Sequence, residues 1–326
     1  MYKGLRKTSR NDMYTTTPLT AGNSVYASIP TRQTQIMSIL NTTPDSFSDG
    51  GSNALDSQSL RETAAAHIAA GATIIDVGGQ SSRPNAPDVT AEEEINRVLP
   101  AISAIKSLPE AEGIAISVDT YRAAVAEAAV NAGADIVNDI SAGMMDPQML
   151  PTVARLGCTY IMMHMRGTPA TMQNPNNCTY ESGLGLTIGL ELKKRIRGAI
   201  DSGVRRWRLI LDPGIGFSKT QEQNLALLQM NRYLLNHRKP TGFIPASRAI
   251  PWLVGSSRKG FIGNITGVSE PKDRVLGTAV AVTASIQGGA DIVRVHDVKE
   301  MAQVVKMADA IYRRPLSDTG DPQLET

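Results

Sequence analysis

Short runs of apolar residues alternate along most of the chain with longer stretches in which apolar residues recur every three or four positions. The short runs predict eight buried strands, at residues 36–40, 73–77, 114–118, 135–138, 159–163, 208–211, 252–255 and 291–295. The longer stretches predict a helix after each strand, at residues 60–70, 91–106, 122–132, 147–156, 184–202, 221–237, 273–287 and 299–313. Eight such units predict an α/β fold, a single-domain (β/α)8 TIM barrel. An open, doubly wound sheet is the alternative, because the pattern does not show closure.

Local signals mark the ends of several predicted helices. Thr90 and Glu93 have the spacing of a capping box at the start of the second helix. Glycines that favour the left-handed position after a helix follow five of them: Gly71, Gly133, Gly157, Gly203 and Gly288.

The two ends of the chain lack this pattern. Residues 1–33 are rich in Ser and Thr, with basic residues near the start, and we expect a disordered leader or linker. A transit peptide is the alternative, although the amphipathic arginine pattern of such peptides is poor here. The barrel is expected at residues 34–314, and residues 315–326 are expected to form a disordered tail.

Composition narrows the class of protein. The 326 residues, 41% of them hydrophobic, suffice for a barrel of about 250 residues. The net charge of +2 is spread along the chain, so we expect neither a nucleic-acid surface nor a membrane surface, and no apolar run reaches the roughly 18 residues of a membrane span. Cys158 and Cys178 fit no metal-ligand spacing and are predicted to be reduced, buried thiols. We expect a cytoplasmic protein, with mitochondria as the alternative.

Polar residues follow each predicted strand, and in a barrel these positions share one mouth. Asp119, Asn138 and Asp212 supply carboxylates and an amide. Together they could hold a flat heterocycle with an amino-amidine edge through charge-assisted hydrogen bonds. The alternative for either aspartate is the N-cap of a following helix.

Basic residues at the same ends predict an anion site. They are Arg83, Lys259, Arg294 and His296. Arg294 and His296 are two positions apart on a strand, so they face the same side and can bind one anion. With Asn41 they suggest a phosphate or diphosphate site that includes Mg²⁺, an ion that keeps most of its waters and takes few protein ligands. The alternative is a surface pair between Arg294 and Asp297.

The loop after the first strand, residues 41–51, combines hydroxyls, carboxylates, two glycines and a single aromatic residue, Phe47. This composition suggests a lid over a polar ligand. An ordinary polar turn with a buried Phe is the alternative.

The strand-end motifs together resemble those of dihydropteroate synthases. They are Asn41–Gly50, Asp76–Pro84, Ser117–Thr120, Asn138–Ile140, Met163–Met165, Asp212–Phe217, Ser257–Lys259 and Arg294–His296. They occur in the order of that family over residues 35–312, and eight motifs in register are a specific signal.

The resemblance implies a TIM-barrel transferase that joins 6-hydroxymethyl-7,8-dihydropterin diphosphate to 4-aminobenzoate, releasing pyrophosphate. It implies that the catalytic residues are Asp119, Asp212, Lys259, Phe47 and Arg83. It assigns the pterin pocket to Asp119, Asn138, Asp212 and Lys259, and it adds Met163, Gly216 and Phe217 as substrate-binding residues. The diphosphate and Mg²⁺ site would comprise Asn41, Arg294 and His296, and the aminobenzoate site Phe47, Ser82, Arg83, Pro84, Ser257 and Lys259. Members of the family are commonly dimers, and eukaryotic members are fused to other folate-pathway enzymes.

Two departures and two rival interpretations remain. Gln80 stands where a Glu is common and Ser82 where Thr is usual, which affects the expected affinity for aminobenzoate and sulfonamides more than the chemistry. A methyltetrahydrofolate-binding methyltransferase barrel shares the pterin-binding aspartates and asparagine but needs no diphosphate site. A catalytically silent barrel that serves as a scaffold in a fused protein is the second rival.

Overall fold

The computed structural model describes residues 33–42, 57–81, 89–235 and 250–313. The predicted tail, and the predicted leader apart from Gln33, lie outside these ranges. The described residues form the predicted barrel, so the strand and helix pattern of the sequence is confirmed as one domain.

Eight parallel strands form one sheet in the order β6-β5-β4-β3-β2-β1-β8-β7. They are β1 (Gln35–Asn41), β2 (Ile74–Gly78), β3 (Ala115–Asp119), β4 (Ile136–Asp139), β5 (Thr159–Met163), β6 (Leu209–Asp212), β7 (Leu253–Val254) and β8 (Ile292–Val295). A parallel bridge between Leu211 and Trp252 joins the two edge strands, where the amide of Leu211 donates to the carbonyl of Pro251 at 2.9 Å. The alternative of an open sheet is therefore wrong.

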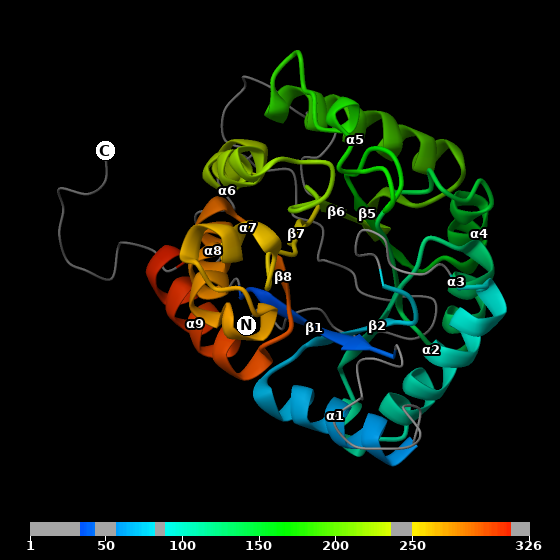
Figure 1. Cartoon of the computed structure of the whole chain (residues 1–326). Helices are drawn as coiled ribbons and strands as arrows, with labels where there is room; N and C mark the ends of the chain where they lie inside the picture. Colours follow the sequence, from blue (N-terminus) through cyan, green and yellow to red (C-terminus); the bar gives the residue numbers. More distant parts are fainter. Residues whose placement is uncertain (1–32, 43–56, 82–88, 236–249, 314–326) are drawn as a thin grey trace, which may run out of the picture.

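Helices surround the strands on the outside of the barrel (Figure 1). They are α1 (Ser57–Ala70), α2 (Ala91–Lys106), α3 (Ala123–Ala132), α4 (Met149–Leu156), α5 (Leu184–Asp201), α6 (Gln221–Leu235), α7 (Gly260–Thr266), α8 (Val275–Gly288) and α9 (Val298–Tyr312). The sequence pattern missed α7, which is a single short helix containing two glycines. Among the described helices, none combines the length and apolar character needed to cross a lipid bilayer.

The helix-end signals are confirmed with two corrections. Thr90 accepts a hydrogen bond from the amide of Glu93, but the carboxylate of Glu93 pairs with Arg97 instead of completing the capping box. Four of the five glycines adopt the left-handed conformation after their helices. Gly288 does not: it is the last residue of α8, and Gly289, with φ of 109°, occupies that position.

Strand register brings the polar positions to one rim. Asn41 is paired with Gly78, Gly78 with Asp119, and Asp119 with Asn138 across four neighbouring strands. The strands themselves are almost entirely buried, because side chains fill the interior and helices cover the outside. The polar residues at the C-terminal strand ends therefore line the mouth of an otherwise apolar barrel.

Candidate active site

A guanidinium joins two carboxylates at the centre of the mouth. Arg294, on β8, donates from Nε to Asp76 on β2 and from Nη2 to Asp119 on β3, both at 2.6 Å. The same Oδ2 oxygen of Asp76 accepts a hydrogen bond from the side-chain amide of Asn138 on β4 at 3.0 Å. Arg294 thus contacts the predicted pterin-binding side of the site directly. The alternative of a surface pair with Asp297 is wrong, because Asp297 pairs with Arg258.

Neither predicted aspartate is a helix N-cap. The N-cap of α3 is Arg122, three residues after Asp119. Asp212 accepts a hydrogen bond from the amide of Gly214 at 2.7 Å, within the loop that precedes α6. The alternative of helix capping is therefore wrong for both, and their carboxylates serve the mouth of the barrel.

Burial makes these carboxyl groups weak acids. It raises the pKa of Asp119 to about 7, although the charge of Arg294 opposes the shift. It raises the pKa of Asp212 to about 6, although the hydrogen bond from Gly214 and the charges of Lys259, Lys219 and Arg294 oppose it. For Arg294 itself, the neighbouring Asp76 and Asp119 outweigh burial and raise the pKa further. Both aspartates can therefore gain or lose a proton near neutral pH.

Lys259, in the loop between β7 and α7, lies over an aromatic ring. Its Nζ is 4.1 Å from the centre of the Phe217 ring, a cation–π contact. A Cβ on Gly216 would lie 2.9 Å from Cδ of Lys259, so glycine leaves the room that the lysine occupies. Phe217 packs in a cluster of buried apolar residues with Met163. The structure therefore brings together four of the predicted substrate-binding residues: Met163, Gly216, Phe217 and Lys259.

Ser257 and His296 are hydrogen-bonded to each other. Oγ of Ser257 lies 3.0 Å from Nδ1 of His296 and accepts a hydrogen bond from its backbone amide at 3.2 Å. The resemblance placed the two residues in different subsites, whereas the geometry makes them one unit at the ends of β7 and β8.

Asn41 lies at the rim beside Gly78. A Cβ on Gly78 would be 3.5 Å from Oδ1 of Asn41 and 3.6 Å from Cβ of Asp119. Within the described ranges, no group of three or more His, Cys, Asp or Glu residues is arranged to hold a metal ion. A single amide oxygen suits Mg²⁺, which retains most of its water shell and is bound largely by substrate phosphates.

Four predicted residues lie outside the described ranges: Phe47, Ser82, Arg83 and Pro84. Their assignment to the aminobenzoate site stays a prediction. The neighbouring Gln80 is described: its amide nitrogen is 3.0 Å from the hydroxyl of Tyr121, and its oxygen accepts a hydrogen bond from Arg122. The neutral side chain at this position thus belongs to a contact that links the loops after β2 and β3.

Three charged residues next to the site were missed in the sequence. Asp76, in the second of the strand-end motifs, accepts hydrogen bonds from Arg294 and Asn138. Lys219 is a buried residue of the loop that follows β6, and its Nζ donates to the carbonyl of Phe217 at 2.9 Å. Glu191, on α5, accepts a hydrogen bond from Nε2 of the buried His164 at 2.7 Å. A charged residue among buried neighbours was the available signal for Asp76, but the other two lie in stretches that resemble ordinary loop and helix.

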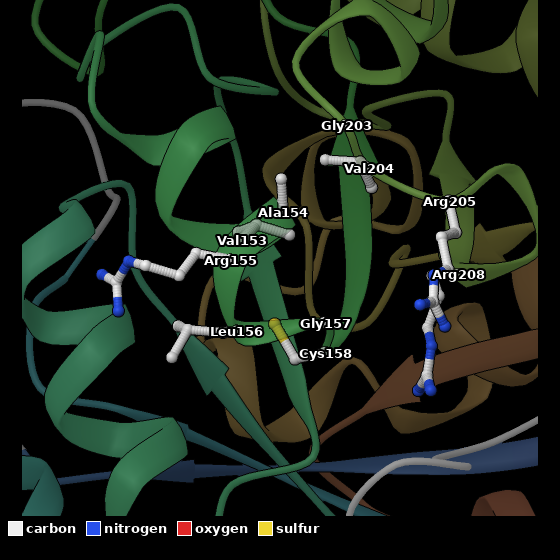
Figure 2. A pocket seen from close by; sticks show the side chains of 10 residues that line it. All are labelled: Val153, Ala154, Arg155, Leu156, Gly157, Cys158, Gly203, Val204, Arg205 and Arg208. Carbon is white, nitrogen blue, oxygen red and sulfur yellow. The ribbon is translucent and has the colours of Figure 1, made fainter.

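A separate hollow of about 230 Å³ lies at the other end of the barrel. Figure 2 shows Leu156 and Cys158 on one side of it and Arg205 and Arg208 on the other. Cys158 directly precedes β5 and Arg208 directly precedes β6, so the hollow is at the N-terminal ends of the strands. It contains none of the predicted site residues. Cys158 is buried as predicted, but Cys178 is partly exposed.

Comparison with known proteins gives the family. The model of the family described as "Pterin binding enzyme" matches residues 37–296. The chain belongs to the pterin-binding enzyme family. The "Folic acid synthesis protein fol1" of Pneumocystis carinii is 50% identical over 281 residues, which are 86% of this chain and 36% of that protein.

Two other members of the family complete the comparison. The "Folate synthesis bifunctional protein, mitochondrial" of Arabidopsis thaliana is 46% identical over 86% of this chain and 50% of its own length. The chain thus spans about a third to a half of these curated relatives. A solved structure of Xanthomonas albilineans dihydropteroate synthase with 4-aminobenzoic acid is 33% identical, with a TM-score of 0.74 over 86% of this chain and 93% of that one.

Proposed function

We propose that this member of the pterin-binding enzyme family is a dihydropteroate synthase. It would condense 6-hydroxymethyl-7,8-dihydropterin diphosphate with 4-aminobenzoate to give 7,8-dihydropteroate and pyrophosphate. The observation that carries the proposal is the convergence of Asp119, Asn138, Asp212, Lys259, Arg294 and His296 on one barrel mouth, with Arg294 bonded to Asp119 and Lys259 over Phe217. The likeness to a solved dihydropteroate synthase over nearly its whole length supports it.

The buried acceptors suit the edge of a pterin ring. Its amino and ring N–H groups can donate to the carboxylates of Asp119 and Asp212, and Asn138 can both donate and accept. Phe217 and Met163 offer apolar surface to the ring, and the nearby charge of Lys259 discourages protonation of Asp212. The buried, low-dielectric setting strengthens these hydrogen bonds relative to water.

The cations suit the departing group. Arg294 has five N–H donors, and the contacts described above use two of them, so the guanidinium can also donate to a diphosphate oxygen. In the proposed reaction the bond between the pterin methylene and the diphosphate oxygen breaks first, and the diphosphate leaves with the electron pair. The amine nitrogen of aminobenzoate then bonds to the methylene carbon and loses a proton. Arg294 and His296 would stabilise the charge that develops on the leaving oxygen.

We propose Mg²⁺ as the metal that accompanies the diphosphate. Asn41 would hold it with its side-chain oxygen, which lies at the rim close to Asp119. The ion would neutralise charge on the leaving diphosphate. The expected result is activity that depends on added Mg²⁺ and is lost with a chelator, and full activity in its absence would contradict the proposal.

We also propose that the chain works as the synthase part of a longer folate-synthesis protein and as a homodimer. The names and coverage of the relatives support the fusion. Exposed apolar residues on α8 support the dimer. The cytoplasm is the proposed compartment, and the mitochondrial name of the Arabidopsis relative supports the alternative.

Incubation with the pterin diphosphate, labelled aminobenzoate and Mg²⁺ tests the activity, and we expect labelled dihydropteroate. The Asp119→Asn variant should bind the pterin more weakly by about 1.5 to 3 kcal/mol, because it loses a charge-assisted hydrogen bond. Tight binding of methyltetrahydrofolate without response to the pterin diphosphate would favour a methyltransferase. An absence of all pterin binding in calorimetry would favour a silent scaffold.

A further inference from the structure

Lys219 is a buried cation with an unusual set of partners. It belongs to the loop that joins β6 to α6 and is only 2% exposed. Its Nζ donates to the carbonyl of Phe217 at 2.9 Å and lies 3.2 Å from Nδ1 of His164. Both of these partners, a backbone carbonyl and a neutral imidazole, are uncharged. A buried ammonium held by neutral groups costs free energy, so a structural benefit or a function must offset it.

The histidine that contacts Lys219 is neutral and fixed in one tautomer. His164 is fully buried, and burial together with the charge of Lys219 lowers its pKa to about 3. Its Nε2 is 2.7 Å from a carboxylate oxygen of Glu191, which is an acceptor, so the ring proton is on Nε2. Nδ1 is then the acceptor for the ammonium of Lys219. Burial opposes ionisation of Glu191, but its hydrogen bonds with His164 and Arg166 outweigh burial and lower its pKa to about 2.

This chain of contacts holds the loop that carries part of the pterin pocket. Gly214 packs so closely on the carbonyl of His164 that a Cβ would overlap it. Oγ of Ser218 accepts from the amide of Arg166 at 2.8 Å and donates to its carbonyl at 2.7 Å. The loop between them presents Gly216 and Phe217 to Lys259. The position of the pocket wall therefore depends on the end of β5 and on α5.

The charged groups around Lys219 link it to Asp212. Burial lowers the pKa of Lys219 to about 7, the carboxylates of Asp212 and Glu191 raise it, and the guanidinium of Arg195 lowers it. Cys178 also faces it. In return, the charge of Lys219 opposes the upward shift in the pKa of Asp212. The pKa values of both groups lie near neutral pH, and a protonated Lys219 favours the ionised form of Asp212.

We propose that Lys219 is a positioning residue for pterin recognition: the Glu191–His164–Lys219 chain fixes the loop bearing Gly216 and Phe217 and keeps Asp212 available as a hydrogen-bond acceptor. The proposal rests on the function proposed above. Lys219 does not touch the pterin in this scheme but acts through its neighbours. The group that it serves, Asp212, must be a carboxylate to accept two donors of the ring.

The test is pterin diphosphate binding, measured by calorimetry without aminobenzoate from pH 5.5 to 8.5. Lys219→Met should weaken binding at least about tenfold at pH 6.5 and move the midpoint of the pH profile up by about one unit, because Asp212 loses a neighbouring positive charge. Most of the affinity should return by pH 8.5. Lys219→Arg should restore part of the profile because it keeps the charge. Lys194→Met removes an exposed lysine from α5 and should change nothing.

Glu191→Gln is the second variant, in case Lys219→Met does not fold by circular dichroism. It keeps a hydrogen-bonding side chain beside His164 and should shift the profile in the same direction by a smaller amount. A profile that keeps its midpoint in both variants, or a loss of affinity that is equal at every pH, would overturn the proposal. If the wild-type protein binds no pterin at any pH, the proposed function fails and this inference fails with it. If the wild-type protein binds the pterin and both variants keep its pH profile, this inference fails and the proposed function stands.

Discussion

Arg294 couples the two halves of the proposed reaction through a single side chain. Its guanidinium bonds to Asp76 and Asp119 on the predicted pterin side, and His296 directly follows the strand that carries it. A lysine would not reproduce this geometry, because its donors are all on one nitrogen, whereas Arg294 uses two separate nitrogens, Nε and Nη2. In the proposed reaction, one residue would therefore contact both a pterin-binding carboxylate and the leaving diphosphate.

Asp76 is predicted to be essential to that arrangement. Asp76→Ala would leave Nε of Arg294 and the amide of Asn138 without their shared acceptor, so we expect a loss of about 3 kcal/mol in the free energy of unfolding. Pterin affinity should fall with it. Urea unfolding and calorimetry measure both effects.

The matched control is Ser117→Ala. Ser117 is the register partner of Asp76 and equally buried, but its hydroxyl has no hydrogen-bond partner in the described part of the chain. Its removal should change the free energy of unfolding by less than about 0.5 kcal/mol. Equal effects of the two substitutions would mean that Asp76 matters only as a buried polar group.

Asp212 should make the folded protein less stable as pH rises. Burial raises its pKa from 3.8 to about 6, so the folded state binds the proton more tightly than the unfolded state. The stability present below pH 3.8 is therefore lost as pH rises through about 6. Asp212→Asn should raise the free energy of unfolding by about 1 to 3 kcal/mol at pH 7 and by little near pH 4. The same variant should lose pterin binding.

Urea unfolding at several pH values measures the difference between the variant and the wild type. Asp201→Asn, at an exposed carboxylate on α5, serves as the control and should change stability by less than about 0.5 kcal/mol. A gain in the free energy of unfolding that does not depend on pH would show that burial does not raise the pKa of Asp212.

The sequence indicated the residues at the strand ends but not those behind them. Asp119, Asn138 and Arg294 were predictable because parallel strands in a barrel end at one mouth. Lys219 and Glu191 were not, because their importance comes from a contact with His164 that joins three separate elements. The alternative pair of Arg294 with Asp297 came from their proximity in sequence, and it does not form because the fold pairs Asp297 with Arg258.

At the scale of elements, the strands and most helices were predictable from apolar periodicity. The exception, α7, has seven residues and two glycines, so neither length nor propensity identified it. The strand β7 has only two residues, although the sequence predicted a strand of four. The pattern located it because Trp252 to Val254 are apolar, and these residues are buried in the structure. Contacts with neighbouring elements decide the limits of such short elements, and one sequence does not reveal them.

The loop after β6 should depend on glycine at one position. Gly214 has φ of 71°, and a Cβ there would overlap the backbone of His164, so Gly214→Ala combines conformational strain with a clash that side-chain motion cannot relieve. We expect a loss of more than about 3 kcal/mol in the free energy of unfolding, or a displaced loop with impaired pterin binding. Thermal unfolding and calorimetry distinguish these outcomes.

Gly157→Ala is the matched control for strain alone. Gly157 is also left-handed, with φ of 64°, but a Cβ there would have no heavy atom within 4 Å. Its replacement should cost about 1 kcal/mol and leave pterin affinity unchanged. Similar results for both glycines would contradict the close approach of Gly214 to β5.

At the scale of the whole molecule, the barrel separates chemistry from scaffold. The predicted pterin and diphosphate residues within the described ranges gather at the C-terminal ends of the strands, while the hollow beside Cys158 lies at the opposite ends. Closure between Leu211 and Trp252 connects β6 to the segment entering β7. Asp212 and Lys259 are therefore brought to one mouth by the seam of the barrel, an arrangement that an open sheet would not provide.

The outer surface carries the prediction for assembly. On α8, Leu276 is 83% exposed and Val280 is 72% exposed, and their spacing of four residues puts them on one helix face. Neighbouring large apolar side chains on one exposed face are a candidate interaction surface. A second copy of the chain can cover it symmetrically, since a two-fold axis brings the same face of both subunits together.

The double variant Leu276→Glu, Val280→Glu should therefore convert the proposed dimer to a monomer. Four carboxylates would face each other across the axis, and their repulsion and desolvation would oppose an interface that must bury about 1,600 Å². Sedimentation equilibrium measures the change, with Leu190→Glu as the control because that residue is an exposed apolar side chain on α5. Both substitutions lie on α8, on the outside of the barrel and not at its mouth, so pterin binding by the monomer should persist. A monomeric wild type, or a double variant that stays dimeric, would show that this face serves another purpose.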